Sequence, residues 1–464
     1  MEINKKKIVV FGSVILSGIL LIAVGWKMDQ KQAENQKGEI HFYDKEEKEF
    51  AVVRMNVSGG SMDYDCQDEF LSYADTAYQE AVDQIMDQEQ CSREDALVLI
   101  GKNNWKIHTT LDTNIQKLLY DEVTDQEAFI RNGFGMAIND TAGHVLACMS
   151  YGEEKNYVLN HTYAGSSMKP LSVYGPAIEN GTINWSTMVE DAPYNTVTDA
   201  SGETRDWPAN TAPYTYEACT AADGLKKSLN TLAVRILKQY GVENSCDFLE
   251  DKLGVKLDKE REIMKEQGED EILGNIALGY LRNGISVKEM AGFYQVFANG
   301  GTYVPSHTVM RIEKNADMYY ENEEIMSTVF TNQTSYIMNR MMKRVLEDGG
   351  TAHGAYMDGY DIVGKTGTSD NNADNWFIGC TPEYVCAIWY GRTPENLMVE
   401  KKVSFQLYDD IITKIEKEGD EFRQPENIET QIICSKSGQL AGDCCTDTMT
   451  GYYKPGTELD ICQE

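Results

Sequence analysis

Histidine and positive charge are both scarce in this chain of 464 residues. The six histidines are scattered and show no spacing typical of metal ligands, so we expect neither a zinc hydrolase nor a bound metal or other cofactor. Lysine and arginine total 42 against 74 aspartates and glutamates, which gives a formal net charge of −32. This balance argues against nucleic acid and anionic lipid as partners of the body of the protein. A solvated acidic surface explains the charge.

Long apolar runs are missing too, with one exception. Residues 8–26 carry no charge and are long enough to span a bilayer. Lysines at positions 5–7 precede them, so the positive-inside rule puts the N-terminus in the cytoplasm and the rest outside. We therefore expect a cytoplasmic stub at 1–7 and a single-pass transmembrane helix at 8–26. A cleaved signal peptide ending near Ala23-Val24-Gly25 is the competing interpretation, and the length of the apolar run disfavours it.

Cysteine, by contrast, is abundant, with 11 residues. Four of them, Cys434, Cys444, Cys445 and Cys462, crowd a C-terminal tail at 431–464. Outside a membrane such a cluster is a candidate disulfide staple for a loop-rich segment. Adjacent cysteines rarely pair with each other, so we expect at least one disulfide from Cys444 or Cys445 to Cys434 or Cys462. A set of unpaired thiols is the alternative.

A possible nucleophile and its base occur together in Ser166-Ser167-Met168-Lys169. Residues three apart share one face of a helix, so Lys169 can reach the hydroxyl of Ser166. Pro170 would clash with the Ser166 carbonyl inside a helix, which predicts a helix that begins close to Ser166. A serine needs a base to become nucleophilic, and a lysine base must be neutral part of the time. Burial and the charge of Lys365 would lower the pKa of Lys169. The alternative is a capped surface helix with a solvated lysine.

The second motif is Ser228-Leu229-Asn230, within a stretch whose apolar residues have helical spacing. A serine and an asparagine two apart do not share a helix face. They must therefore lie on a loop or a helix junction to point into one cleft. One interpretation makes Ser228 a helix N-cap. The functional interpretation makes Ser228 a proton relay and Asn230 an amide that holds a substrate peptide.

The third motif is Lys365-Thr366-Gly367-Thr368, which continues an apolar strand pattern from Asp361. Glycine in a strand allows a ligand or another backbone to approach closely. The charge of Lys365 suits a substrate carboxylate, and the backbone N–H of Thr368 suits a developing oxyanion. Residues 359–366 also match a phosphate-binding loop formally. Such a loop is a strand-to-helix turn, whereas a second strand pattern follows here, so a nucleotide site is not expected.

The three motifs in this order resemble those of the transpeptidase domain of class A penicillin-binding proteins, over roughly residues 105–464. Further matching strings lie at 109–116, 164–181, 297–301 and 374–379. The resemblance implies an α/β (α+β) serine acyltransferase fold of the penicillin-binding protein and β-lactamase type. In that fold a mainly antiparallel sheet has helices on both faces, and the serine helix lies against an all-helical subdomain.

The resemblance also implies roles for eight residues. Catalysis falls to Ser166, Lys169 and Ser228, and substrate binding to Asn230, Lys365, Thr366, Gly367 and Thr368. The implied substrates are peptidoglycan stem peptides, with β-lactam antibiotics as covalent inhibitors. The implied location is the bacterial cell membrane, with the catalytic domain on the extracytoplasmic side.

The chain departs from class A members in one respect. Those proteins carry a glycosyltransferase domain between anchor and transpeptidase, and residues 27–104 are too few to hold it. We expect a membrane-proximal linker or pedestal at 27–104, the transpeptidase domain at 105–430, and the cysteine-rich tail. A helical pattern within 67–103 includes a start at Ser92 and Asp95 that resembles a capping box. We expect no glycan polymerisation, and a separate glycan polymerase as a partner.

Three functions compete at this point. The first is D,D-transpeptidation through a serine acyl-enzyme, and the second is hydrolysis by a D,D-carboxypeptidase or β-lactamase. The third is a non-catalytic β-lactam sensor or scaffold, although a sensor would be expected to have a cytoplasmic output domain. A class A β-lactamase needs a glutamate to activate water. The three glutamates Glu250, Glu260 and Glu262 lie in a charged stretch better explained as a solvated face.

Overall fold

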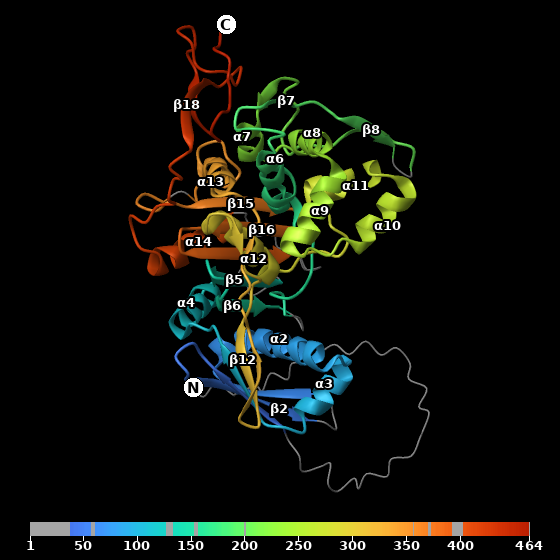
Figure 1. Cartoon of the computed structure of the whole chain (residues 1–464), viewed down its shortest axis with the longest axis vertical. Coiled ribbons are helices and arrows are strands. Elements are labelled where there is room, and N and C mark those ends of the chain that lie inside the picture. The colour runs from blue at the N-terminus through green and yellow to red at the C-terminus, as the bar shows by residue number, and fades with distance from the viewer. Residues whose placement is uncertain are drawn as a thin grey trace.

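The computed structural model describes residues 38–463, apart from 57–60, 127–132, 153–155, 199–200, 356, 370–372 and 392–401. The predicted stub and transmembrane helix at 1–26 lie outside the described residues. Within the described part, no helix combines the length and apolar character that crossing a bilayer requires. The molecule is elongated, with a sheet of N-terminal strands at one end and the cysteine-rich tail at the other (Figure 1).

The N-terminal sheet combines strands from two distant parts of the chain. Its order is β13-β12-β4-β1-β2-β3, in which only β1 and β4 pair in parallel. The strands are β1 (Glu39–Tyr43), β2 (Glu49–Asn56), β3 (Ser61–Cys66), β4 (Trp105–Thr109), β12 (Val309–Lys314) and β13 (Asp317–Glu321). The boundary expected after residue 104 therefore falls inside one sheet, because β4, β12 and β13 join strands that precede it.

Helical elements between β3 and β4 pack beside this sheet (Figure 1). They are η1 (Asp68–Phe70), α2 (Leu71–Glu89) and α3 (Arg93–Ile100). The Ser92 side chain caps α3 by accepting a hydrogen bond from the Asp95 N–H, which confirms the predicted helix start. Glu80 of α2 forms a half-buried ion pair with Lys288 and accepts hydrogen bonds from the N–H groups of Thr308 and Val309. These contacts tie the N-terminal unit to the rest of the chain.

The central sheet is fully antiparallel, in the order β15-β16-β17-β5-β6. Its strands are β15 (Val363–Thr368), β16 (Asp374–Cys380), β17 (Tyr384–Gly391), β5 (Phe134–Asp140) and β6 (Val145–Tyr151). Both faces are buried, because alternate residues belong to different cores: Ala387 packs on one side of the sheet and Ile388 on the other. The sheet therefore needs helices on both faces.

Those helices are α12 (Val287–Ala298) on one face and the pair α4 (Thr113–Thr124) and α14 (Lys402–Ile415) on the other. Helix α13 (Asn332–Leu346) packs against α12 and against the edge strand β15. The predicted antiparallel sheet with helices on both faces is thus confirmed. Its edge strand carries the third sequence motif.

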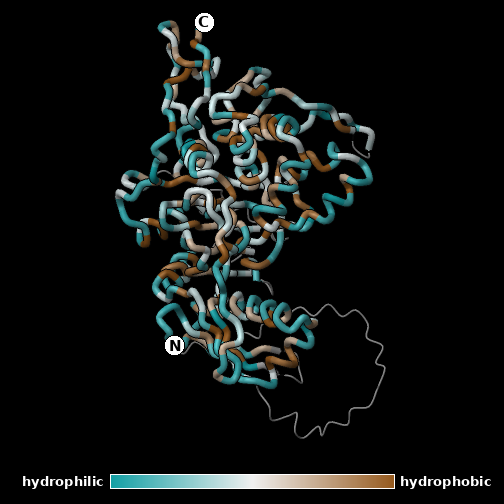
Figure 2. The backbone as a smooth tube through the Cα atoms, viewed as in Figure 1, coloured by the Kyte–Doolittle hydropathy of each residue, from teal (hydrophilic) through white to brown (hydrophobic). Residues whose placement is uncertain are grey.

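A helical subdomain completes the predicted architecture. It contains α6 (Gly175–Asn180), α7 (Ala221–Lys226), α8 (Asn230–Tyr240), α9 (Val242–Leu253), α10 (Asp258–Gln267) and α11 (Asp270–Leu278). Apolar segments run through α8, α9 and α11, whereas α10 at the outer edge is mostly hydrophilic (Figure 2). Small two-stranded antiparallel sheets accompany these units: β7 (Met188–Glu190) with β10 (Ala218–Thr220), β8 (Asn195–Thr198) with β9 (Thr204–Trp207), and β11 (Thr302–Tyr303) with β14 (Ser327–Thr328).

The C-terminal tail is a hairpin of β18 (Glu429–Cys434) and β19 (Thr448–Tyr453) that packs on α13. The disulfide predicted for this tail is not formed. All eleven cysteines lie among the described residues, and none of them takes part in a disulfide bond. Instead, the sulfur atoms of Cys434, Cys445 and Cys462 converge to within 4.8 Å of one another.

A second convergence brings together residues that sequence spacing did not connect. His144 follows β5, His307 precedes β12, and one ligand atom from each lies within 4.8 Å of a Glu324 carboxylate oxygen. The His144 ring bonds Asp140 through Nδ1 at 2.7 Å and Glu324 through Nε2 at 2.6 Å. Hydrogen bonds to these two carboxylates raise the pKa of His144 to about 9. A protonated His144 held between two carboxylates therefore explains why these side chains lie together.

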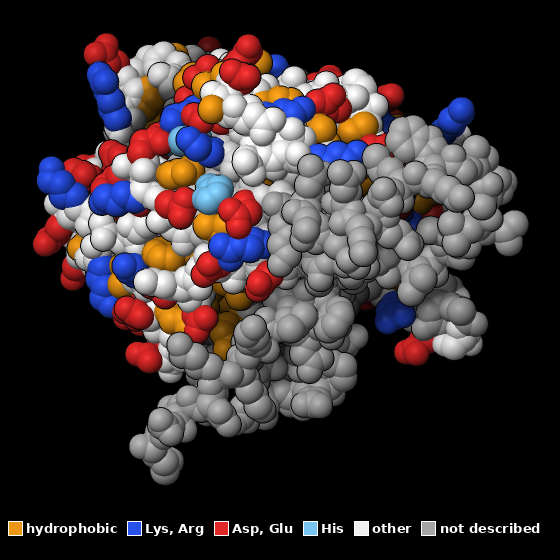
Figure 3. All heavy atoms as spheres, turned by 90° about the horizontal axis from the view of Figure 1, so that it is seen from below, with side chains coloured by type: hydrophobic (Ala, Val, Ile, Leu, Met, Phe, Trp, Pro, Cys, Tyr) orange, Lys and Arg blue, Asp and Glu red, His pale blue; other side chains and the backbone are white. Residues whose placement is uncertain are grey.

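The surface fits the acidic composition. Seen from below, acidic and basic side chains are interspersed over the described part of that face, which has no continuous basic patch (Figure 3). Charged stretches that looked featureless in the sequence have local partners. Arg261, for example, pairs with Asp247 and Glu250 across the helical subdomain.

Candidate active site

The first motif opens an irregular helix. Gly165–Met168 is a 3-10 turn, and the Lys169 N–H donates to the Ser166 carbonyl. Residues 170–174 continue as a π-helical turn, before α6 takes up a regular helix. Pro170 has no N–H to donate, and inside a regular helix its ring would clash with the carbonyl of the residue four positions earlier. This explains why the helix is irregular here. The prediction of a helix that begins close to Ser166 is confirmed.

Ser166 and Ser167 have different surroundings. Ser166 is half-buried, whereas Ser167 is fully buried and its hydroxyl donates to the Ala164 carbonyl at 2.6 Å. The carbonyl of Ser167 accepts a hydrogen bond from the Tyr294 hydroxyl at 2.5 Å. Ser167 is therefore a structural residue that fixes the turn, and Ser166 is the one accessible from the cleft.

Lys169 is fully buried one turn after Ser166. Its Nζ donates to the Ser228 carbonyl at 2.8 Å and to Asn230 Oδ1 at 2.6 Å. Burial lowers the pKa of Lys169 well below its usual value, and the positive charge of Lys365 lowers it further. Lowering this pKa increases the neutral fraction of the amine near neutral pH, which is the form that can accept a proton.

Ser228 lies at the junction of two helices, between the last residue of α7 and the first of α8. Its backbone has a φ of +57°, a left-handed conformation that a serine adopts only when its surroundings enforce it. The hydroxyl of Ser228 accepts a hydrogen bond from Lys365 Nζ at 2.8 Å. The predicted junction is confirmed, and the N-cap interpretation is wrong because Leu229 occupies that position of α8.

The third motif approaches the serine turn through glycines. A β-carbon on Gly367 would lie 2.4 Å from the Ala164 carbonyl oxygen, and one on Gly165 would lie 2.6 Å from the Thr368 oxygen. Any other residue would push β15 away from the turn. Lys365 is fully buried, while Thr366 and Thr368 are half-buried. Strand β16 follows β15, so the strand-to-helix context of a phosphate loop is absent from this described region.

The structure thus brings the eight predicted site residues together, and it adds residues that sequence reasoning missed. Asn210 Oδ1 accepts the backbone N–H of Asn230 at 2.8 Å, and Asn230 Nδ2 donates to the Ala209 carbonyl at 2.6 Å. Thr351 and Thr366 share a hydroxyl hydrogen bond of 2.7 Å. No local pattern marks Asn210 or Thr351, since each meets the site only through the folded chain.

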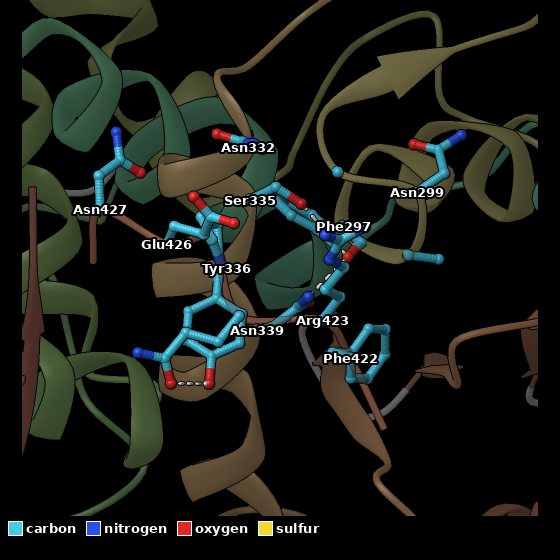
Figure 4. A pocket seen from close by; sticks show the side chains of 14 residues that line it. Phe297, Asn299, Asn332, Ser335, Tyr336, Asn339, Phe422, Arg423, Glu426 and Asn427 are labelled. Carbon is cyan, nitrogen blue, oxygen red and sulfur yellow. Dashed lines mark hydrogen bonds between the residues drawn. The ribbon is translucent and has the colours of Figure 1, made fainter. Parts of the chain in front are cut away.

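Two cavities differ in their relation to this site. One of about 540 Å³ lies beside it, lined by residues that flank Ser228 and contact Thr366: Lys227, Leu229 and Thr351. A larger one of about 810 Å³ lies between the ends of α12 and α13 and the 422–427 segment (Figure 4). Its lining includes Asn299, Tyr336 and Phe422 but none of the eight site residues. The smaller cavity is the one placed to receive a substrate of Ser166.

Much of the chain is similar in sequence to known proteins. Residues 133–412 match the penicillin-binding protein transpeptidase domain family. Penicillin-binding protein 4 of Bacillus subtilis is 29% identical over 316 residues, which cover 66% of this chain and 47% of that protein. Penicillin-binding protein 1F of Bacillus subtilis is 30% identical over 383 residues, covering 77% of this chain and 49% of that protein. The chain thus spans about half the length of these curated relatives.

Solved structures agree on the fold. Penicillin-binding protein 1A from Haemophilus influenzae aligns with a TM-score of 0.64 at 15% identity, over 84% of this chain and 77% of that one. The D,D-transpeptidase domain of a peptidoglycan glycosyltransferase from Eggerthella lenta aligns with a TM-score of 0.58 at 17% identity, over 82% of this chain and 98% of that one. The family match covers more than half of the 464 residues. This chain therefore belongs to the penicillin-binding protein transpeptidase family.

Proposed function

We propose that this protein is a D,D-transpeptidase that cross-links peptidoglycan stem peptides through an acyl-enzyme on Ser166. One observation carries the proposal: the buried Lys169, one helical turn from Ser166, has a lowered pKa because of burial and the charge of Lys365. A buried amine of lowered pKa, one helical turn from an accessible serine hydroxyl, suits the base of an activated serine nucleophile.

In the proposed acylation, Ser166 Oγ attacks the carbonyl carbon of the penultimate D-alanine, and Lys169 Nζ takes the serine proton. The bond to the terminal D-alanine breaks, and its amine receives a proton from the Ser228 hydroxyl, which regains one from Lys169. Lys365 donates to that hydroxyl at 2.8 Å, which orients Ser228 as a relay. The N–H groups of Ser166 and Thr368 are the proposed donors to the oxyanion, at the N-terminus of the serine helix and on the facing strand.

In the proposed second step, an amine from a neighbouring stem peptide attacks the acyl-enzyme, forms the new peptide bond and frees Ser166. A β-lactam would acylate Ser166 in the same way and remain attached. We propose that Lys365, Thr366 and Thr368 hold the terminal carboxylate of the donor peptide. Thr366 is half-buried beside the cavity of about 540 Å³, which favours this side of the site for the donor.

Hydrolysis is the main competing function, and the glutamates considered for it have other roles. Glu250 pairs with Arg261, and the buried Glu260 accepts the backbone N–H of Arg282 at 2.7 Å. Both stabilise the helical subdomain, and Glu262 is exposed on α10. None of the three therefore supports a deacylating water, so transfer to an amine remains the favoured second step.

The setting of the enzyme is also a proposal. Stem peptides are extracytoplasmic, so we place the catalytic domain outside the cell membrane, held by the predicted helix at 8–26. We further propose that the protein cross-links glycan chains made by a separate polymerase. A non-catalytic scaffold would not require a buried lysine of lowered pKa one helical turn from its serine.

The test compares Ser166→Ala with Ser167→Ala in labelling by a fluorescent penicillin. Ser166→Ala should lose covalent labelling completely, while Ser167→Ala should keep it, because the Ser167 hydroxyl is committed to the Ala164 carbonyl. Labelling of Ser166→Ala but not of Ser167→Ala would reject the assignment of the nucleophile. Mass spectrometry with a donor peptide, with and without an acceptor amine, then distinguishes a cross-linked product from a hydrolysed one.

A further inference from the structure

The three cysteines that converge in the tail come from three different segments. Cys434 ends β18, Cys445 lies in the loop between β18 and β19, and Cys462 lies in the segment after β19. Their sulfur atoms all lie within 4.8 Å of one another. Cys434 is 6% exposed, Cys462 is 3% exposed, and Cys445 is half-buried. The fourth tail cysteine, Cys444, is exposed and does not belong to this group.

Backbone hydrogen bonds and a glycine allow the three cysteine-bearing segments to approach one another closely. The N–H of Cys434 donates to the Gln439 carbonyl at 2.8 Å, and the N–H of Cys462 donates to the Leu440 carbonyl at 2.8 Å. A β-carbon on Gly442 would lie 2.4 Å from the Cys462 carbonyl oxygen, so only glycine lets the 442–445 turn reach Cys462. These contacts hold three separate segments of the tail close together around the sulfur atoms.

Spacing distinguishes the possible uses of such a group. A disulfide joins two sulfur atoms at about 2.05 Å and would leave the third thiol over. A tetrahedral Zn²⁺ ion with zinc–sulfur bonds of about 2.3 Å holds its sulfur ligands about 3.8 Å apart. Three mutually close sulfur atoms, two of them buried, fit the second arrangement with little movement. Soft thiolate ligands also select zinc over magnesium or calcium.

We propose that Cys434, Cys445 and Cys462 bind one Zn²⁺ ion as thiolates, with a water molecule as the fourth ligand. Binding releases the thiol protons to solvent.

The tail buries few apolar side chains, so a bound metal would add stability that its core does not supply. Within residues 431–463, all of which the structure describes, the side chains buried most completely are those of Ile433, Cys434, Tyr453 and Cys462. Two of these four are cysteines of the group, so the tail has almost no apolar core of its own. Small loop-rich units with so little core are usually held by a metal or by disulfides.

The site would anchor the tail next to the catalytic domain. Gly438 lies against the Ser186 carbonyl, Tyr452 packs on Trp185 with ring centroids 5.3 Å apart, and Lys454 pairs with Glu179 at 3.1 Å. Glu179 belongs to α6, which continues the helix of Ser166. The tail contributes none of the eight site residues. Loss of zinc should therefore loosen the tail and leave acylation of Ser166 in place.

The experiment measures zinc in the full-length chain, purified in detergent with a thiol reductant and dialysed into metal-free buffer. Mass spectrometry for metals should find about one zinc per chain, and almost none in the triple variant Cys434→Ser, Cys445→Ser, Cys462→Ser. Replacement by Co²⁺ should give thiolate-to-metal charge-transfer absorption in the wild type only. Labelling by a fluorescent penicillin shows that each variant has a folded catalytic domain.

Two matched controls make the assignment specific. Cys444→Ser changes the neighbouring thiol and should keep the full zinc content. Cys91→Ser changes a half-buried cysteine in the N-terminal unit and should also keep it. Zinc in the wild type no higher than in the triple variant would overturn the proposal, as would zinc loss in Cys444→Ser. So would a disulfide between any two of the three cysteines in protein isolated without reductant.

Discussion

The Nζ atom of Lys169 lies 2.6 Å from Oδ1 of Asn230, and this contact joins the first sequence motif to the second. The other end of the Asn230 amide donates to the Ala209 carbonyl, so both ends of the side chain are engaged. The second motif predicts that Asn230 holds the substrate peptide. The contacts of Asn230 make it a positioning residue for Lys169 as well. The position and protonation of the Lys169 amine therefore depend on the geometry of the α7–α8 junction.

The first prediction separates the two lysines. Lys169→Arg should be nearly inactive in acylation, because an arginine does not lose its proton near neutral pH. Lys365→Arg should retain part of the activity, since it keeps the positive charge in a different shape. Acylation rates with a fluorescent penicillin measure both variants. Wild-type rates for Lys169→Arg would remove Lys169 as the base.

The second prediction concerns pH. Acylation should rise with pH as Lys169 loses its proton, and level off above its lowered pKa. Lys365→Gln removes the positive charge that helps to lower this pKa, so the rising limb should move to higher pH. Lys365→Arg keeps the positive charge, so its acylation rate should rise over the same pH range as in the wild type. The rate profile from about pH 5.5 to about pH 10 spans this change. Identical limbs for Lys365→Gln and wild type would contradict the prediction.

The third prediction uses the Lys169–Asn230 contact. Asn230→Asp places a negative charge 2.6 Å from Nζ, which favours the protonated lysine and should raise the pKa of Lys169. The acylation rate near neutral pH should fall, by roughly tenfold if the pKa rises by about one pH unit, and it should recover at higher pH. Asn427→Asp adds the same charge at an exposed position beside the distant cavity, and its profile should match the wild type.

The fourth prediction tests the backbone contact of β15 with the serine turn. Gly367→Ala introduces a β-carbon 2.4 Å from the Ala164 carbonyl oxygen, so the strand must move away from Ser166. A displacement of this kind can reduce catalysis about 100-fold, and we expect an acylation loss of that order. Thermal unfolding should change by only a few degrees. An unchanged acylation rate would show that the strand position is not critical.

The fifth prediction concerns stability. The pKa of His144 is raised to about 9 in the folded protein by Asp140 and Glu324, against about 6.5 when unfolded. Its contribution is therefore fully present below about pH 6.5 and is lost as pH rises through about 9. His144→Gln should destabilise the protein by at most about 3 kcal/mol near about pH 6 and by much less near about pH 9.5. Denaturant unfolding at both pH values measures this, and the exposed His353→Gln is the control.

Local chemistry in the sequence determined much of this protein. The order of the three motifs identified the family and the candidate nucleophile. The position of Pro170 fixed where the serine helix begins, because the clash it avoids lies within five residues of chain. The two-apart spacing of Ser228 and Asn230 predicted a junction, since no helix puts both on one face. Each of these inferences depends on contacts over a few residues.

Only the tertiary structure decided the rest, because it depends on residues that are distant in the chain. Lys169 contacts the Ser228 carbonyl, and Lys365 contacts the Ser228 hydroxyl, because folding buries both lysines around Ser228. The N-terminal sheet takes β12 and β13 from beyond residue 300, which no boundary drawn along the sequence could show. Sequence spacing suggested a disulfide in the tail, whereas the folded loops bring three sulfur atoms together. Spacing along a chain says which residues are near neighbours, and packing alone says which distant ones meet.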